Sequence, residues 1–515
     1  MKLTKIASAS IQGIDAFSVT VETLVDRGVM FTIVGLPDTA VRESHTRIVS
    51  ALKQSGIEFP HRRTVVNLSP ADVRKEGASF DLPMAIGILA SNELIDAAAI
   101  ENTMMTGELS LDGSVLPVKG VLPMAIKARQ MGLRRMIVPA ANAVEAAVVN
   151  DVEVYGVATL AEAVDLLKGE SDLQPTVIDT RAMFASRCEV FDYDFSEVKG
   201  QESVKRAIEI ACAGGHNLLM IGAPGSGKSM MAKRIPSILP PLTLHEALET
   251  TKIHSVAGKL KSGATLMTHR PFRMPHHTVS PVALVGGGTN PKPGEISLAH
   301  NGILFLDEFP EFQRSVLEVM RQPMEDRVIT VSRAKYSVDY PASFMLVASM
   351  NPCPCGYYGH PRRRCTCPGG AVERYMNRIS GPLLDRIDLQ VEIQPVEFDD
   401  MASREATTDS ATMRANVCRA RAIQQERYAD HPGIYCNAQM TSRLLQQYAW
   451  PDAAGLAALK ERMTRLNMSA RAFDRILRVA RTIADLDGSP TVDKRHIAEA
   501  IGYRNLDRGT YGRDR

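Results

Sequence analysis

One stretch of this 515-residue chain reads Gly222-Ala223-Pro224-Gly225-Ser226-Gly227-Lys228-Ser229. An apolar run at residues 218–221 precedes it and a helical pattern at 230–235 follows it, so its spacing and context are those of a phosphate-binding loop. The glycines let backbone N–H groups turn toward phosphates, and the start of the following helix adds positive potential. We expect Lys228 to bind the β- and γ-phosphates of ATP and Ser229 to ligate Mg²⁺. A glycine turn without a ligand is the alternative.

A second apolar run, residues 303–306, ends in Asp307 and Glu308. A buried strand would bring Asp307 to the Mg²⁺ ion and leave Glu308 able to polarise the water that attacks the γ-phosphate. Such a pair is common by itself, but here it follows the phosphate loop within the same α/β region. Because both carboxylates are present, the sequence predicts ATP hydrolysis rather than ATP binding alone.

Three further positions resemble functional positions of the AAA+ class of ring-forming ATPases. Asn351 ends a third apolar run (residues 344–349) and resembles sensor 1, which orients the attacking water; an amide that opens a turn is the alternative. Arg386 resembles the arginine finger of the subgroup that includes magnesium chelatases and MCM helicases, and Arg471 resembles sensor 2. Surface ion pairs are the alternative for both arginines. A finger supplied to a neighbouring subunit implies a ring.

The rest of the chain divides into regions around these motifs. Residues 1–169 alternate β-branched runs with helical stretches, and residues 170–197 lose this periodicity, as a linker does. Residues 198–397 alternate again and predict a parallel sheet with sites at the carboxyl ends of its strands. Residues 398–515 read as helices, and Asp493 is a plausible N-cap for the last of them.

Composition excludes several classes of protein. Hydrophobic residues make up 45% of the chain and charged residues 23%, which is ordinary for a globular protein, and the formal charge is only +2. Contact with nucleic acid would therefore depend on local basic segments. We find no signal peptide and no apolar run of the roughly 20 residues that a membrane helix needs, so the cytoplasm is the expected compartment.

Four segments carry a closer resemblance: residues 273–278, 286–297, 321–325 and 351–356. They resemble the ComM (YifB) family of magnesium-chelatase-like AAA+ proteins, and the resemblance runs nearly end to end. It implies an α/β protein with an N-terminal Lon-like (ribosomal S5 domain 2-like) α+β domain, a P-loop AAA+ α/β core and a C-terminal helical lid. It also implies an ATP-dependent DNA helicase that works as a homo-hexamer and promotes branch migration during natural transformation.

The N-terminal region resembles the Lon peptidase domain but departs from it at one position. Residues 75–85 match the segment that carries the nucleophile, with Ser79 in its place. A serine nucleophile needs a base, and the lysine that supplies it in Lon is replaced here by Leu122, with Lys119 three positions away. We therefore expect an inactive domain with a structural or docking role.

Four cysteines flank a short loop at residues 356–364, and they are Cys353, Cys355, Cys365 and Cys367. Four thiolates on two short arms can form a tetrahedral Zn²⁺ site and hold a loop too small to fold alone. The C-x-C arms are tighter than the usual C-x₂-C. His360 could replace one sulfur, and reduced cysteines in a flexible loop are the alternative.

Three basic segments are candidates for contacts with DNA phosphates, which attract arginine and lysine without regard to base sequence. One is the cysteine loop, one is a pair of β-like runs that resembles the pre-sensor hairpin of MCM-type helicases, and one is a glycine-rich insert before Asp307. Their residues are Arg362, Arg363 and Arg364 in the first, Arg333 and Lys335 in the second, and His276, His277 and Lys292 in the third. Solvated turns are the alternative for each.

We expect first a DNA translocase or helicase that acts as a ring on single-stranded or branched DNA. The alternative is a motor subunit of the magnesium-chelatase type, which would drive metal insertion through a separate partner. A Lon-like protease or protein remodeller ranks third, because the sole aromatic residue between residues 252 and 301 is Phe272, whereas unfoldases usually grip polypeptide with an aromatic pore loop.

Overall fold

The computed structural model describes residues 3–180, 191–260, 266–288, 291–333, 336–396, 407–466, 468–504 and 506. The chain groups into two compact units. Unit 1 comprises Met1–Arg187, Leu244–Thr268 and Pro291–Pro293, and unit 2 comprises Cys188–Thr243, His269–Asn290 and Gly294–Arg515. The segment Leu244–Thr268 thus packs in unit 1, although the sequence placed it within the ATPase core. The predicted domain boundaries near residues 169, 197 and 397 stay predictions.

Unit 1 is built on a seven-stranded mixed sheet with the order β3-β4-β2-β1-β5-β8-β9. A long antiparallel hairpin, β1 with β2, forms its centre, and β4 adds to it antiparallel to β2, while the outer pairs are parallel. The strands are β1 (Leu3–Gln12), β2 (Asp15–Asp26), β3 (Phe31–Val34), β4 (Arg63–Ser69), β5 (Thr103–Met105), β8 (Arg135–Pro139) and β9 (Glu153–Val157).

Helix α3 (Asp81–Ser91) forms the core of unit 1, because every one of its residues is buried. Helix α11 (Leu244–Val256) packs against α5 (Val121–Gln130) in the same unit. The buried carboxylate of Glu145 accepts hydrogen bonds from the Leu122 N–H at 3.0 Å and from the Ser255 hydroxyl. This polar contact fastens α11 to unit 1. The remaining helices are α1 (Thr39–Arg42), α2 (Ser44–Gln54), α4 (Ala97–Ile100), α6 (Ala143–Ala146) and α7 (Leu160–Lys168).

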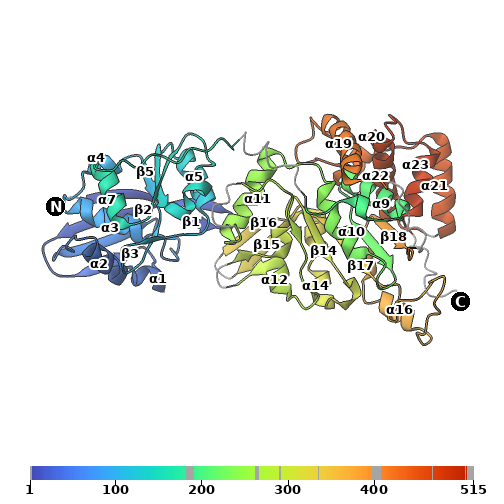
Figure 1. Ribbon diagram of the computed structural model, residues 1–515, viewed down its shortest axis with the longest axis horizontal. Coiled ribbons are helices and arrows are strands. Elements are labelled where there is room, and N and C mark those ends of the chain that lie inside the picture. Colours follow the sequence, from blue (N-terminus) through green and yellow to red (C-terminus); the bar gives the residue numbers. More distant parts are fainter. Residues whose placement is uncertain are drawn as a thin grey trace. The chain divides into compact units, whose positions relative to one another are not determined.

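Unit 2 contains a five-stranded sheet with the order β11-β14-β17-β10-β18, in which all neighbours are parallel (Figure 1). Its strands are β11 (Phe272–Arg273), β14 (Ile303–Leu306), β17 (Met345–Met350), β10 (Leu218–Gly222) and β18 (Leu389–Ile393). The register pairs Ile221 with Met350 and Leu306 with Ala348. Because the strands run in one direction, their carboxyl ends meet at one edge, as the sequence predicted.

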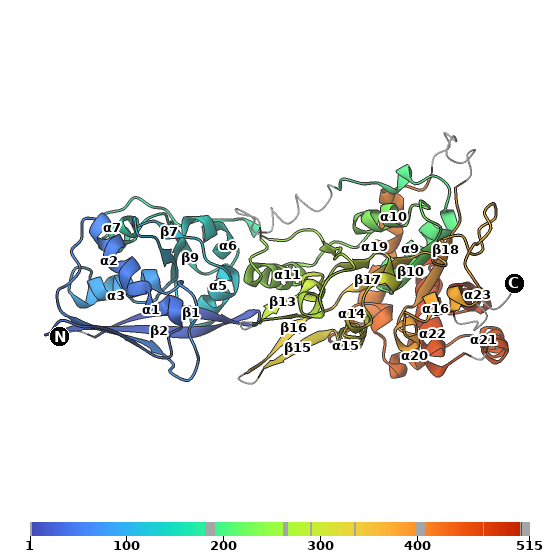
Figure 2. The same ribbon diagram turned by 90° about the horizontal axis from the view of Figure 1, so that it is seen from below.

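Helices α9 (Glu202–Gly214) and α10 (Lys228–Arg234) pack on this sheet, and their apolar residues share one core with β10, β14, β17 and β18. A separate two-stranded ribbon pairs β15 (Val328–Arg333) with β16 (Tyr336–Pro341) in antiparallel register. Figure 2 shows this ribbon extending beyond the helices α14 (Arg314–Glu318) and α15 (Arg321–Asp326). Its turn, which includes Lys335, lies outside the described residues.

The C-terminal part of unit 2 is helical, which confirms the expected helical lid. Its helices are α19 (Ser410–Arg427), α20 (Ser442–Tyr448), α21 (Ala453–Leu466), α22 (Ala470–Leu486) and α23 (Lys494–Gly502). Asp493 caps α23 as predicted. Its side chain accepts a hydrogen bond from the His496 backbone N–H, and the His496 side chain accepts one from the Asp493 backbone N–H, which forms a capping box. In the part of the chain that the structure describes, each helix is too short or too polar to cross a membrane.

Candidate nucleotide site and cysteine loop

The phosphate loop lies between β10 and α10, with Gly225 and Gly227 in the left-handed region at φ of 79° and 88°. A side chain would strain the backbone at both positions, so glycine is required there. The Lys228 ammonium is buried and donates to the Gly222 carbonyl at 2.7 Å and to Asn351 Oδ1 at 3.2 Å. Burial lowers the pKa of Lys228. The fold therefore brings Lys228 and Asn351 together, from segments 123 residues apart in the chain.

Asp307 follows β14 and faces the start of α10. Its Oδ2 accepts a hydrogen bond from Ser229 Oγ at 2.6 Å, and its Oδ1 accepts one from Ser349 Oγ. A hydroxyl beside a carboxylate at the phosphate loop is the oxygen donor set that suits Mg²⁺, so these residues fit the ion. Sequence reasoning missed Ser349. Its signal was weak, because a single hydroxyl within an apolar strand shows its role only when the neighbouring strand is known.

Glu308 lies next to Asp307 in an unusual backbone conformation. Its φ of 54° places it in the left-handed region, which is rare for a residue with a side chain and costs of the order of 1 kcal/mol. The carboxylate is exposed, and its Oε2 lies 3.3 Å from His277 Nδ1. The His277 ring in turn contacts the His276 ring in a tilted arrangement, with ring centroids 4.1 Å apart. The sequence grouped these histidines with the DNA candidates, whereas His277 contacts the predicted catalytic carboxylate.

A pocket of about 630 Å³ lies over the phosphate loop. Ala223 to Gly227 form one wall and residues between Glu197 and Gln201 contribute to another, together with Pro395 and Val396. The remaining wall comes from the cysteine loop, through Tyr357, His360, Arg362 and Arg363. The volume and the phosphate loop fit a nucleotide. No sequence motif indicated that the cysteine loop borders this pocket.

The four cysteines of that loop lie close together, with their sulfur atoms all within 4.8 Å of one another. The sulfur of Cys353 is 3.3 Å from that of Cys355 and 3.8 Å from that of Cys365. A tetrahedral zinc site with Zn–S bonds of about 2.3 Å has S–S edges of about 3.8 Å, so the cluster fits the ion. Burial opposes ionisation of Cys355, but backbone hydrogen bonds from Tyr357 and Thr366 lower its pKa to about 5.

His360 is not among the four residues of this cluster. Its Nδ1 accepts hydrogen bonds from the backbone N–H groups of Arg362 and Arg363, both at 3.0 Å. The ring nitrogen that faces the loop is therefore engaged with the backbone. The structure gives His360 a role in shaping the loop rather than the role of a fourth ligand.

Neither Arg386 nor Arg471 lines the pocket over the phosphate loop. Arg386 is buried and pairs with Glu325 at 2.5 Å, and its Nη1 donates to the Pro382 carbonyl at 2.6 Å. Arg471 is exposed on the first turn of α22. Arg386 is thus engaged by Glu325 and Pro382 of its own chain, whereas the side chain of Arg471 is open to solvent.

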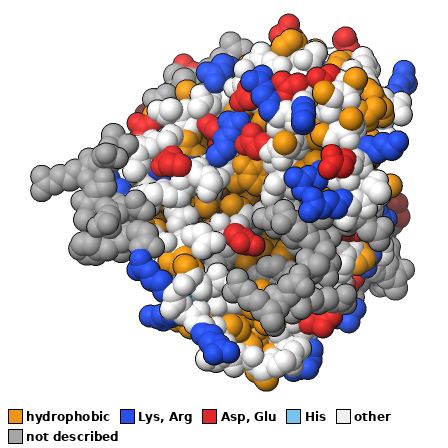
Figure 3. Space-filling view, turned by 90° about the vertical axis from the view of Figure 1, so that its right-hand side faces the viewer, with side chains coloured by type: hydrophobic (Ala, Val, Ile, Leu, Met, Phe, Trp, Pro, Cys, Tyr) orange, Lys and Arg blue, Asp and Glu red, His pale blue; other side chains and the backbone are white. Residues whose placement is uncertain are grey.

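The candidate DNA residues fall into different places. Lys335 and the side chain of Arg333 lie outside the described residues, at the turn of the β15–β16 ribbon. All three arginines of the cysteine loop are exposed; Arg362 and Arg363 line the nucleotide pocket, whereas Arg364 is absent from its lining. On the face of the molecule in Figure 3, the basic and acidic side chains that are described are interspersed. Among the described side chains of that face, no purely basic field marks a DNA surface.

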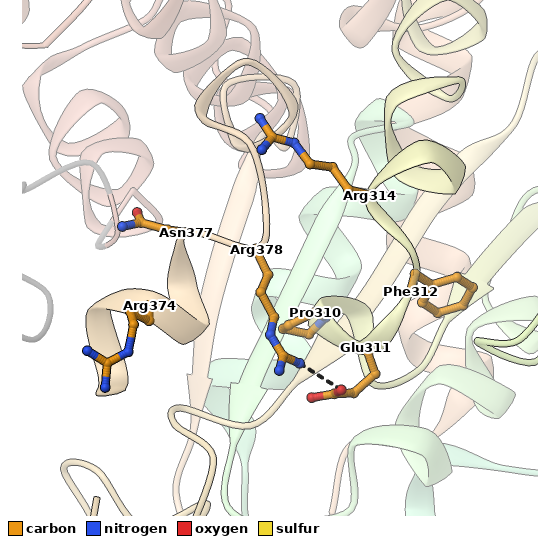
Figure 4. Close-up of a pocket in the computed structure, with 7 residues that line it drawn as sticks. All are labelled: Pro310, Glu311, Phe312, Arg314, Arg374, Asn377 and Arg378. Carbon is orange, nitrogen blue, oxygen red and sulfur yellow. Dashed lines mark hydrogen bonds and ion pairs between the residues drawn. The ribbon is translucent and has the colours of Figure 1, made fainter. Parts of the chain in front are cut away.

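A second pocket, of about 580 Å³, lies between η4 (Phe309–Glu311) and α16 (Ala371–Met376). Arg314, Arg374 and Arg378 line it together with Glu311 (Figure 4). Arg378 pairs with Glu311 at 2.7 Å, whereas Figure 4 shows the other two arginines directed away from that pair. The sequence motifs did not point to this basic pocket.

In unit 1, the Ser79 carbonyl accepts hydrogen bonds from the Gly107 N–H at 2.9 Å and the Thr106 hydroxyl at 3.3 Å. Leu122, at the position of the Lon lysine, is fully buried. Lys119 extends toward Gly258, where an added Cβ would lie 2.6 Å from Lys119 Cε. The one lysine near the expected position thus packs elsewhere.

Three models of magnesium-chelatase protein families match the chain. The model described as magnesium chelatase, subunit ChlI, matches residues 194–401. A second, described as subunit ChlI of Mg-chelatase, matches residues 21–142, and a third, the C-terminal part of subunit ChlI, matches residues 407–504. Together they cover both units.

Relatives match over nearly the whole length. The chain is 42% identical over 511 residues to the competence protein ComM of Haemophilus influenzae, and the match covers 98% of each protein. It is 41% identical over 514 residues to YifB of Escherichia coli, over 99% of this chain and 98% of the relative. A shorter match, 35% identical over 122 residues, links it to Lon protease 2 of Bacillus subtilis and covers 23% of this chain and 21% of that protein.

Proposed function

We propose an activity for this chain from its family, since the chain belongs to the ComM (YifB) family of magnesium-chelatase-like AAA+ proteins. That family implies an ATPase that uses ATP and Mg²⁺. We infer that the chain is a ring-forming, ATP-driven DNA translocase that promotes branch migration in recombination. The observation that carries the proposal is the convergence of Lys228, Asp307 and Asn351 at one edge of a parallel sheet.

Each residue at this edge has a distinct chemical task. The phosphate loop from Gly222 to Ser229 would bind the triphosphate, with Lys228 on the β- and γ-phosphates. Ser229 and Asp307 would hold Mg²⁺, which neutralises phosphate charge when bound. Glu308 would accept a proton from the water whose oxygen bonds to the γ-phosphorus, while the bond to the β–γ bridging oxygen breaks and leaves ADP and phosphate. Asn351 would orient that water.

Arg386 supports the ring arrangement. Because it pairs with Glu325 and is not among the residues that line the pocket of its own chain, it would serve the site of a neighbouring subunit, exchanging Glu325 for the phosphates. Arginine fingers supplied in this way raise the rate by about 10³–10⁵. Arg471, exposed at the start of α22, would act in the sensor 2 role. A closed homo-hexamer is the assembly that we propose, by analogy with the class.

Contacts with DNA would come from the turn of the β15–β16 ribbon. Arg333 ends β15 and Lys335 precedes β16 in the sequence, and a narrow ribbon with basic residues at its end could enter a pore and follow phosphates. The relative from Haemophilus influenzae is named a competence protein, which supports a role in handling DNA. Arg362, Arg363 and Arg364 remain a second candidate surface.

We propose that the cysteine loop binds one structural Zn²⁺ through Cys353, Cys355, Cys365 and Cys367. Their S–S distances support the assignment, since they approach the edges of a zinc tetrahedron. Metal analysis of the purified chain should find about one zinc per chain, and substitution of Cys365 and Cys367 by serine should remove it.

ATP-driven migration of a synthetic three-strand DNA junction tests the activity. Wild-type protein should convert the junction in the presence of ATP, and Lys228→Ala should abolish conversion, because the phosphates lose their cation. Equal conversion by the two proteins, or conversion without ATP, would exclude the proposed motor.

A magnesium-chelatase-type motor subunit is the second candidate, because the matching family models carry that description. ATP hydrolysis that is indifferent to DNA and coupled to a metal-inserting partner would favour it. Leu122 counts against a Lon-like protease or protein remodeller, since it leaves Ser79 without the lysine that Lon employs. Casein degradation that depends on Ser79 would revive that third candidate.

A further inference from the structure

The cysteine loop rests directly on the phosphate loop. A Cβ added to Gly356 would lie 2.4 Å from Pro224 Cδ, so the two loops approach as closely as a glycine permits. The cysteine loop, residues 353–367, begins two positions after Asn351, whose side-chain oxygen accepts a hydrogen bond from Lys228. The loop therefore lies at the phosphate end of the nucleotide pocket.

Tyr357 and Arg363 form one unit within this wall. Arg363 Nη1 donates to Tyr357 Oη at 2.7 Å, and the guanidinium lies 5.1 Å from the centroid of the same ring. The backbone N–H of Arg363 is fixed by His360 Nδ1, and the loop ends in the cysteine cluster. Tyr357 thus holds the exposed guanidinium and His360 fixes the backbone of Arg363, in the wall of the pocket, where a cation can meet an anionic ligand.

We propose that the cysteine loop is part of the nucleotide site, with Arg363 contacting the polyphosphate of the bound nucleoside triphosphate and Tyr357 positioning that arginine. The inference rests on the proposed ATPase function and assigns Arg363 to the nucleotide rather than to DNA. A zinc ion in the cluster would hold the arginine at the pocket, so that metal content and nucleotide affinity are linked.

Arg364 provides a matched control for this proposal. It is the next residue in the loop, carries the same charge and is exposed like Arg363, but it is not part of the pocket lining. Calorimetric titration with Mg²⁺ and either ADP or a non-hydrolysable ATP analogue would compare wild type, Arg363→Ala and Arg364→Ala. We expect Arg363→Ala to weaken binding about tenfold or more, as loss of a charge-assisted hydrogen bond does, and Arg364→Ala to change it less than about twofold.

Two results separate the inference from the function on which it rests. If wild type binds nucleotide and both arginine variants bind it equally well while losing affinity for DNA, the arginines serve DNA and the inference is wrong, whereas the ATPase proposal stands. If wild type itself binds no nucleotide, the proposed function fails and the inference fails with it.

A second pair of variants tests the positioning of Arg363. Tyr357→Phe keeps the ring but removes the hydroxyl that accepts from Arg363, and it should weaken nucleotide binding by less than Arg363→Ala does. Cys365→Ser combined with Cys367→Ser should lower both the zinc content and the nucleotide affinity, while the far-ultraviolet circular dichroism stays that of the wild type. Loss of zinc with unchanged nucleotide affinity would overturn the link between the cluster and the pocket.

Discussion

Glu308 occupies a left-handed backbone conformation directly after the buried strand β14. The residue before it is held by two hydroxyls, and its own carboxylate faces His277. Strain of this kind persists where the surrounding fold holds a residue in place, and it is concentrated at functional sites. The geometry gives the two carboxylates different roles. Asp307 accepts hydrogen bonds from two hydroxyl groups, while Glu308 is exposed and able to accept a proton from water.

Glu308→Gln should therefore retain nucleotide binding and lower the rate of ATP hydrolysis by about 10²–10⁴, which is the range for loss of a general base. Glu311→Gln is a suitable control, because Glu311 lies three residues away and pairs with Arg378. Steady-state phosphate release measures both variants. Equal rates in the two would show that Glu308 is not the base.

His216 is a buried residue that makes stability depend on pH. It is fully buried, its Nε2 lies 2.8 Å from Thr482 Oγ1, and burial lowers its pKa to about 4. The unfolded chain, with a histidine pKa of about 6.5, binds the proton more readily between these two values. The contribution of neutral His216 to the free energy of unfolding is thus fully present above about pH 6.5 and is lost as the pH falls toward 4.

Lowering the pH from 7 to 5 should therefore reduce the free energy of unfolding of the wild type by roughly 2 kcal/mol more than that of His216→Gln. Chemical denaturation of both proteins at the two pH values measures the change in the free energy of unfolding for each. The contributions of other histidines cancel when the change in the variant is subtracted from the change in the wild type. An identical pH dependence in both proteins would show that His216 titrates normally in the folded state.

At the scale of elements, periodicity and motifs predicted much of unit 2. The apolar runs at 218–221 and 303–306 form β10 and β14, and Asp493 caps α23. The same reasoning missed β11, because two residues carry no periodicity. It also missed the place of the cysteine loop. That loop meets the phosphate loop through tertiary contact between Gly356 and Pro224, which lie 132 positions apart, and local sequence does not encode such a contact.

The prediction for the elements concerns the β15–β16 ribbon and its proposed contacts with DNA. Arg333→Ala combined with Lys335→Ala should leave basal ATP hydrolysis intact and abolish its stimulation by branched DNA. In a plot of the logarithm of DNA affinity against the logarithm of salt concentration, the slope should become less steep by about one to two. Each lost phosphate contact contributes roughly 0.7–0.9 to that slope. Lys53→Ala with Arg62→Ala removes the same charge from exposed positions of unit 1. Equal losses in the two double variants would indicate a general charge effect instead.

At the scale of the whole molecule, the chain passes between its two units more than once. Leu244–Thr268 belongs to unit 1, although both flanking segments belong to unit 2. The family resemblance indicated the two kinds of fold, but it did not indicate that Leu244–Thr268 packs in unit 1. The polar contact between Ser255 and Glu145 joins residues 110 positions apart, and local sequence does not reveal such a contact. Local sequence patterns indicate oligomeric assembly even less directly. A single motif, the one around Arg386, predicts it.

Mixing two inactive variants tests the shared ATP site most directly. Lys228→Ala destroys the phosphate-binding side of a site and Arg386→Ala the side that a neighbour supplies, so each protein alone should hydrolyse almost no ATP. In an equimolar mixed ring, a shared site is intact at about one interface in four, and hydrolysis should recover to roughly a quarter of the wild-type rate. A mixture no more active than its separate components would contradict a site completed by the neighbouring subunit.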